Sequence, residues 1–249
     1  QKTTRESKKY QLRGEILSFI PVEKNVEVML VTITNTGRMA QTVTPTAAIP
    51  LYGRSADNIR DHRHVTSLLH RIETTDTGVL VTPTLSFDER GHQVNHMTYY
   101  CVGWSGNGEK PVDFYPTAED FVGEGGNFER PYAIVKKAEG VKAGTRIEGL
   151  EAVGGLHFSE VTLEPEEECS YLIFTGITED IQEIRNLSKT YTTREMVLEE
   201  LEKTKAYWQE KVNVAYHTGD SDFNQFMHWV SFQPILRRIY GCSFLPHHD

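Results

Sequence analysis

The sequence has few cysteines and no long apolar run. It contains three cysteines in 249 residues, and no two of them form a Cys-x-x-Cys pair. Cys101, Cys169 and Cys242 are widely spaced and odd in number, which argues against a disulfide framework and favours reduced, buried thiols in a reducing compartment. No stretch of about eighteen consecutive apolar residues occurs, so the sequence predicts no membrane-spanning helix and no membrane partner.

Positive charge is also in the minority, with 26 Lys and Arg residues against 35 Asp and Glu residues and a net charge of −9. No cluster of Lys and Arg stands out, whereas a protein that binds nucleic acid through its phosphates needs a basic face. We therefore expect a neutral substrate and no nucleic acid partner. Residues 1–9 have neither an initiator Met nor the apolar segment of a signal peptide, so we expect a cytoplasmic protein whose sequence here begins inside a longer chain.

Familiar catalytic motifs are absent as well. The sequence has no Gly-x-Ser-x-Gly elbow, no phosphate-binding P-loop and no dinucleotide fingerprint. His62 and His64 could share one face of a strand and bind a metal, which would make the chain a metal-dependent β-barrel enzyme, but no third ligand is visible nearby. The favoured interpretation of this pair is a solvated polar segment, and no metal site is predicted.

Strand patterns dominate residues 10–175. Residues 26–34 carry β-branched or apolar side chains at both alternating sets of positions, which predicts a strand that is covered on both faces. Turn residues between apolar runs predict two hairpins, namely 65–72 with 78–85 and 156–163 with 169–177. Because no helix is expected between these strands, the pattern predicts an antiparallel sandwich or barrel.

Helical periodicity begins near Thr178, and the first predicted helix covers residues 178–189. A capping box formed by Thr192 and Glu195 starts a second helix, which extends to Val212. We expect this second helix to pack on the β domain through an apolar stripe of Val197, Leu201 and Trp208. The sequence therefore predicts helices after the strands, and the apolar stripe predicts that the second helix docks on the β domain.

A third helix is predicted to begin near Asp220 and to continue to Gly241, with a kink or a restart at Pro234, which has no N–H group to donate. These patterns divide the chain into three expected parts. They are a β domain at residues 1–177, a helical linker at 178–216 and the start of a further unit at 217–249.

Three segments resemble glycoside hydrolase family 94 phosphorylases. The strongest is Phe-Gln-Pro-Ile-Leu-Arg-Arg-Ile-Tyr-Gly-Cys-Ser-Phe-Leu-Pro-His-His-Asp at residues 232–249, which is similar to the start of the catalytic helical barrel. The Phe-x-Gly and Pro-x-Ala ends of residues 121–133 resemble a loop of cellobiose-type members, and residues 34–58 give a third match. The resemblance implies a mainly β fold, with an antiparallel β-sandwich (super-sandwich), linker helices and the first helix of a truncated (α/α)6 barrel.

The resemblance also implies a function. The parent enzyme would be an inverting glycoside phosphorylase that cleaves β-glucosides, of the β-1,2-glucan or cellobiose type, with inorganic phosphate to give glucose 1-phosphate. This chain would be its non-catalytic N-terminal part, because the general acid is expected downstream of Asp249. An oligosaccharide, phosphate and a second copy in a homodimer are the implied partners, and no cofactor is implied. The alternative is a stand-alone carbohydrate-binding β-sandwich module without catalysis.

Residues 123–132 form a loop with three glycines and several planar polar side chains. Asn127, Glu129 and Arg130 are of the types that hydrogen-bond to vicinal sugar hydroxyls. In the family that the sequence resembles, the corresponding loop reaches the active site of the neighbouring subunit, so these three residues are predicted to bind substrate. An ordinary surface turn is the alternative.

Two further groups are candidates for sugar contacts. The resemblance places His247, His248 and Asp249 beside the sugar pocket of the barrel, although in this chain they could equally lack their partners and be disordered. Residues 96–104 form an aromatic strand, and its large side chains could stack on sugar rings. Such residues are more often part of a sandwich core, and this is the interpretation that we favour for Tyr99, Tyr100 and Trp104.

Overall fold

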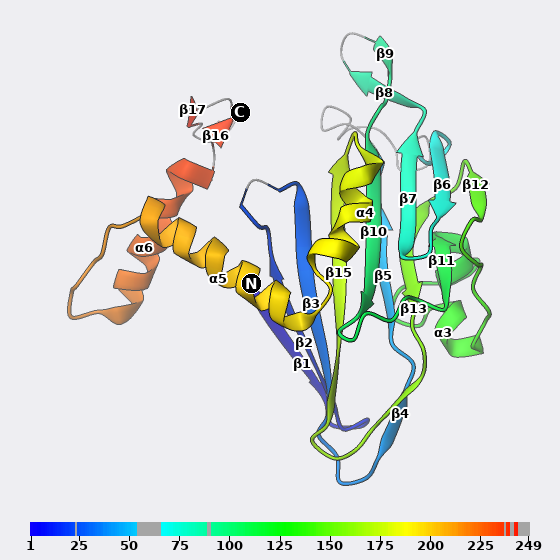
Figure 1. The fold of residues 1–249 in the computed structure, drawn as a ribbon, viewed down its shortest axis with the longest axis horizontal. Coiled ribbons are helices and arrows are strands. Elements are labelled where there is room, and N and C mark those ends of the chain that lie inside the picture. Colours follow the sequence, from blue (N-terminus) through cyan, green and yellow to red (C-terminus); the bar gives the residue numbers. More distant parts are fainter. Residues whose placement is uncertain (23, 54–65, 89–90, 237, 240–241, 244–249) are drawn as a thin grey trace. The chain divides into compact units, whose positions relative to one another are not determined.

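The fold is given by a computed structural model, which describes residues 1–22, 24–53, 66–88, 91–236, 238–239 and 242–243 (Figure 1). The chain divides into two compact units, Gln1–Glu200 and Leu201–Asp249. None of the helices in these described ranges is long and apolar enough to span a membrane. The predicted three-part division at residues 177 and 216 stays a prediction, and each unit is described by itself.

The first unit is built on an eight-stranded sheet in which every neighbouring pair of strands is antiparallel. Its long central strands lie side by side in Figure 1, although they come from distant parts of the sequence. In spatial order the strands are β1 (Lys2–Ser7), β2 (Leu12–Phe19), β3 (Val26–Asn35), β15 (Glu168–Thr178), β10 (Thr98–Ser105), β7 (Gly78–Pro83), β6 (His70–Thr74) and β12 (Arg146–Glu148).

A smaller three-stranded sheet covers one face of this large sheet. It contains β11 (Asp113–Thr117), β13 (Ala152–His157) and β5 (Thr46–Leu51), with β13 in the middle. A buried apolar layer fills the space between the sheets, where Leu156 and Phe114 of the small sheet join Cys101 and Ile173 of the large one. Two separate two-stranded ribbons are formed by β4 (Gln41–Val43) with β14 (Val161–Leu163), and by β8 (Leu85–Asp88) with β9 (Gly91–Val94).

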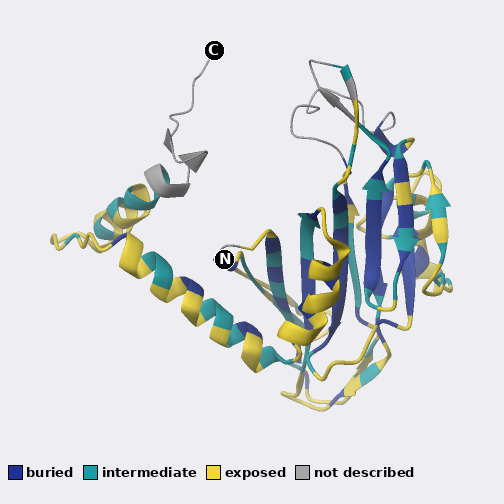
Figure 2. Ribbon diagram, turned by 45° about the horizontal axis from the view of Figure 1, so that its top comes forward, coloured by how far each residue is buried: buried dark blue, intermediate teal, exposed yellow. Residues whose placement is uncertain are grey.

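Helices cover part of the opposite face of the large sheet. They are α4 (Ile181–Thr190) and the first turns of α5 (Arg194–Lys211). Ile184, Leu187 and Val197 pack there against Val28 and Trp104 in a second buried cluster. Figure 2 shows the consequence, since buried residues are concentrated on the central strands while α4 presents an exposed outer face. The prediction that residues 26–34 are covered on both faces is confirmed.

The aromatic strand is a core element, as favoured from the sequence. Tyr100 and Trp104 belong to the cluster beneath the helices, and Tyr99 packs against the cluster between the sheets. Trp104 stacks on Phe174 with 4.8 Å between ring centroids, and its indole N–H donates to the carbonyl oxygen of Tyr191 at 2.8 Å. Tyr100 and Trp104 are therefore not available to stack on a sugar.

Three local predictions for the first unit are wrong. The predicted hairpin of residues 156–163 with 169–177 does not form, because β14 pairs with β4 while β15 pairs with β3 and β10. Two short helices, α2 (Ala118–Val122) and α3 (Tyr132–Lys136), interrupt the strand order where none was expected. The long helix α5 begins one residue later than predicted, since it is the hydroxyl of Thr193, not that of Thr192, that accepts from the backbone N–H of Met196.

The second unit contains the rest of α5, α6 (Ser221–Leu236) and the short strands β16 (Arg238–Ile239) and β17 (Cys242–Ser243). The carboxylate of Asp220 caps α6 by accepting from the N–H groups of Asp222 and Phe223. The helix ends at Leu236, so the predicted continuation to Gly241 is wrong. Within this unit the ring centroids of Trp208 and Phe232 lie 5.9 Å apart. The prediction that Trp208 packs on the β domain stays untested.

Candidate functional site

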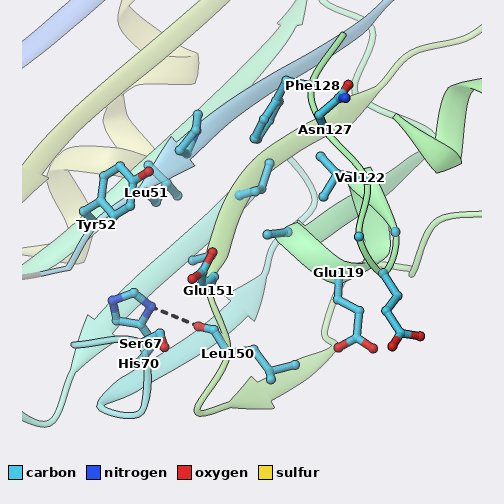
Figure 3. A pocket seen from close by; sticks show the side chains of 18 of the residues that line it. Leu51, Tyr52, Ser67, His70, Glu119, Val122, Asn127, Phe128, Leu150 and Glu151 are labelled. Carbon is cyan, nitrogen blue, oxygen red and sulfur yellow. Dashed lines mark hydrogen bonds between the residues drawn. The ribbon is translucent and has the colours of Figure 1, made fainter. Parts of the chain in front are cut away.

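The ends of three strands meet at one end of the small sheet. Leu51, the last residue of β5, pairs with Ala152, the first residue of β13, and Thr117 at the end of β11 pairs with the same residue after a register shift. The loops that leave these strand ends are therefore brought together. They surround a pocket of about 600 Å³ (Figure 3). Its lining residues come from positions 50–52, 67, 70, 118–119, 122–128 and 149–153.

The short helix α2 supplies part of the lining of this pocket. Thr117 caps the helix by accepting from the N–H of Asp120 at 3.0 Å, and Phe121 buries its ring in the domain. The helix stops at Gly123, whose φ of +79° is disfavoured for residues with a Cβ. A Cβ at Gly126 would lie 1.9 Å from the carbonyl oxygen of Val122, so the backbone can fold back this tightly only with glycine there.

The structure separates the three residues that were predicted for this loop. Asn127 lines the pocket, and its side-chain oxygen accepts from the backbone N–H groups of Glu129 at 3.0 Å and Arg130 at 3.1 Å. The side chains of Glu129 and Arg130 are exposed and lie outside the lining of the pocket. Within the part of the chain that is described, Arg130 forms no ion pair, so the polar groups of both residues are presented to solvent.

Two half-exposed aromatic rings line the same pocket, and neither was predicted from the sequence as a site residue. Phe128 is 49% exposed and rests on the buried ring of Phe121 at a centroid distance of 5.8 Å. Tyr52 is 45% exposed and follows directly after β5. In the view of Figure 3, Tyr52 lies at the left of the pocket and Phe128 at its upper edge, while Glu151 lies below both rings. Both rings lie in segments that resemble the family, residues 34–58 and 121–133. That resemblance was the feature of the sequence that could have pointed to them.

Carboxylates line the described part of the pocket. Glu119, Glu124 and Glu151 contribute to its lining, and no Lys or Arg is among the described residues that do. Each carboxylate can accept hydrogen bonds from hydroxyl groups. The described lining therefore offers acceptors for hydroxyl groups.

His70 is a buried neutral group in the wall of the pocket. It is 2% exposed, its Nδ1 lies 3.1 Å from the carbonyl oxygen of Leu150, and its Nε2 accepts from the N–H of Gly53 at 3.2 Å. Burial lowers the pKa of His70 below its usual value, which keeps the ring uncharged near neutral pH. With both nitrogens engaged by backbone groups, His70 fixes the loop that carries Glu151 and does not serve as a base.

Other candidates from the sequence lie elsewhere. His247, His248 and Asp249 are outside the described residues, and so are His62 and His64. Over the described ranges, no group of three His, Cys, Asp or Glu side chains is arranged to hold a metal ion.

Comparison with known proteins gives one family. The family model described as "Glycosyl hydrolase 94, supersandwich domain" matches residues 1–194. No curated protein matches. Among solved structures, a protein titled "Polysaccharide Lyase BACCELL_00875" is similar at 10% sequence identity and a TM-score of 0.38, covering 74% of this chain and 22% of its own, and at that level the likeness carries no functional argument. The antiparallel sheets described above confirm the β-sandwich that the resemblance implied. The chain belongs to the glycosyl hydrolase 94 family, and residues 1–194 are its supersandwich domain.

Proposed function

We propose that this chain is the non-catalytic part of an inverting glycoside phosphorylase. The parent enzyme would cleave β-glucosides, of the β-1,2-glucan or cellobiose type, with inorganic phosphate and release glucose 1-phosphate. The observation that carries this proposal is the match of the supersandwich family model to residues 1–194. The free cysteines Cys101 and Cys169 support a reducing, cytoplasmic setting.

The proposed chemistry needs one carboxylic acid. An inverting hydrolase uses an acid for the leaving oxygen and a base for water, but phosphate is already an anion and needs no base. We assign that acid, and the groups that hold phosphate, to a helical barrel that follows the supersandwich domain. In this assignment residues 178–216 are the linker, residues 217–249 are the start of the barrel, and His247, His248 and Asp249 lie beside its sugar pocket.

The loop at residues 123–132 would supply contacts to substrate from a second copy of the chain in a homodimer. Asn127, Glu129 and Arg130 are exposed, and the carboxylate and guanidinium are of the types that bind hydroxyl groups. The tight turn at Gly126 sets the path of this segment across the domain surface. The supersandwich domain thus acts by recognition and assembly.

Turnover assays test the proposal directly. The full-length enzyme and the 249-residue chain are each incubated with phosphate and either sophorose or cellobiose, and glucose 1-phosphate is measured. We expect the full-length enzyme to release the α anomer from at least one disaccharide, and we expect no release from the 249-residue chain. Phosphate-independent release of glucose by the full-length enzyme would make it a hydrolase. Robust turnover by the shorter chain, lost on mutation of one of its own residues, would place the acid within this sequence.

Replacing Arg130 by alanine in the full-length enzyme is expected to lower kcat/KM by about tenfold, because a charged hydrogen bond to substrate is lost. The fold should be unaffected, since the side chain is exposed and makes no ion pair with a described residue. Lys136→Ala is the matched control, because it also removes an exposed positive charge nearby. Unchanged kinetics combined with a lower Tm would leave Arg130 with a structural role only.

A further inference from the structure

The small sheet has an open outer edge at β5. In the strand order β11-β13-β5, β5 is the last strand, and no described strand pairs with its other side. The N–H of Phe158 donates to the carbonyl oxygen of Pro45 at 3.0 Å, directly beside the paired residues of β5 and β13. Because alternate residues of an antiparallel pair exchange both hydrogen bonds, Ala47 bonds to β13, whereas the N–H groups of Thr46 and Ala48 point away from it. The edge therefore offers backbone donors and acceptors to a further strand.

An apolar groove of about 290 Å³ lies beside this edge. Its floor is a part of the large sheet that the small sheet leaves open. The residues of the floor are Ile16, Met29, Val31, Ile33, Tyr171 and Ile173. Ile16 is 41% exposed, and Met29, Val31 and Ile33 are each partly exposed. An occupant with apolar side chains would therefore remove apolar surface from water on both partners.

The layers of the sandwich restrict the shape of the occupant. β5 contacts β10 of the large sheet, and β15, β3, β2 and β1 follow beyond β10 in that sheet. If two copies of the chain joined edge to edge at β5, their large sheets would lie in the same layer, and β1, β2 and β3 of the two copies would overlap. A single strand instead fits at about 4.8 Å from β5 and about 10 Å above the large sheet. An extended peptide is therefore the occupant that the geometry allows.

Charged side chains stand near the two ends of the groove floor. On β3, Glu27 faces the same side as Met29 and Ile33, because side chains alternate along a strand. Near the other end, Arg5 of β1 lies opposite Gly14 of β2, which in turn lies opposite Ile33. A peptide complements this floor when it carries apolar side chains at alternate positions, a basic residue at the Glu27 end and an acidic residue at the Arg5 end.

We propose that the outer edge of β5 is a docking site for an extended peptide segment of another protein. The peptide adds one strand to the small sheet, pairs with the backbone of Thr46 and Ala48, and places alternate apolar side chains against Ile16 and Val31. None of the described residues that line the groove also lines the candidate functional site. The interaction therefore does not depend on the proposed function.

Two capped peptides are the probes, Lys-Val-Thr-Ile-Thr-Val-Asp and its reverse, since a strand can pair with β5 in either direction. Their counterparts have serine at the three apolar positions. Binding to the 249-residue chain is followed by calorimetry and by amide hydrogen exchange in NMR. We expect saturable binding of at least one apolar peptide and at least about tenfold weaker binding of its serine counterpart. Exchange of the Ala48 amide should slow, whereas that of Ala47, which bonds to β13, should not change. Absence of saturable binding, or equal binding of the serine peptide, would overturn the proposal.

Two variants locate the peptide on this edge. Ala48→Pro removes an outward N–H and leaves the bonds from β5 to β13 in place, as Pro50 already does at the next outward position. Ile16→Glu places a charge in the groove, and Ile20→Glu is its matched control, because Ile20 is 62% exposed and lies outside the groove lining. We expect at least about fivefold weaker binding for the first two variants and unchanged binding for the control. If Ala48→Pro does not fold, Ile16→Glu decides, and unchanged affinity in that variant would overturn the proposal.

Other occupants of the edge are detected by hydrogen exchange as well. Slow exchange of the β5 amides in the full-length enzyme without peptide, measured by mass spectrometry, would mean that the enzyme's own chain covers the edge. A concentration-dependent dimer of the 249-residue chain that protects the Ala48 amide would mean that a second copy does. Either result would overturn the proposal, whereas we expect fast exchange of this amide in both proteins until peptide is added.

Discussion

Trp104→Ala is expected to lower the free energy of unfolding of the first unit by about 3–5 kcal/mol, in the range measured for large aromatic truncations in protein cores. Trp104 is 3% exposed and stacks on Phe174 at 4.8 Å. Its indole N–H also donates to the carbonyl oxygen of Tyr191, which connects the central strand β10 to the residue that ends α4. The substitution leaves a cavity and removes the donor for a buried carbonyl group, so the two costs add.

Urea unfolding followed by far-UV circular dichroism measures this effect. Trp104→Phe is expected to lose less stability, because it keeps a ring against Phe174 and gives up only the N–H group and part of the area. Trp229→Ala serves as the control, since this tryptophan is 57% exposed in α6. If the midpoint of Trp104→Ala moved no further than that of Trp229→Ala, the assignment of Trp104 to the core would be wrong.

Much of the strand content could be predicted from the sequence because burial of both faces leaves a local pattern. Residues 26–34 are apolar or β-branched at successive positions, and β3 is covered by helices on one face and by the small sheet on the other. Strand partners leave no such pattern. Residues 161–163 and 168–178 are adjacent strands in sequence, yet the turn between them passes from one sheet to another, so the predicted hairpin failed.

The candidate site was predictable only in part, for a similar reason. Asn127 stands in a glycine-rich loop and has a side chain typical of sugar sites, so its chemistry is visible in the sequence. Tyr52, Phe128 and Glu151 are far apart in the chain, and they line one pocket because β5 and β11 end where β13 begins. That convergence depends on strand register and on the irregularity between Tyr115 and Thr117, neither of which a residue pattern specifies.

Gly154→Ala is expected to destabilise the first unit by about 1–3 kcal/mol or more, because it overpacks the space between the two sheets. Gly154 lies in β13 of the small sheet, opposite Cys101 in β10 of the large sheet. A Cβ at Gly154 would lie 2.2 Å from the Cβ of Cys101 and 2.7 Å from its Sγ. Cys101 is fully buried and its Cβ is attached directly to the backbone, so the clash can be relieved only by moving one sheet away from the other.

Gly14→Ala provides the matched control for this prediction. Gly14 is also a strand residue, in β2, but a Cβ there would meet nothing within 4 Å. The same substitution should therefore be neutral or should stabilise the strand by up to about 0.5–1 kcal/mol, because alanine loses less backbone entropy than glycine on folding. The urea midpoint of Gly154→Ala should consequently lie below that of the unaltered chain. The midpoint of Gly14→Ala should be equal to that of the unaltered chain or higher. Equal midpoints would mean that the sheets at Gly154 can separate at no cost, and that their close approach does not contribute to stability.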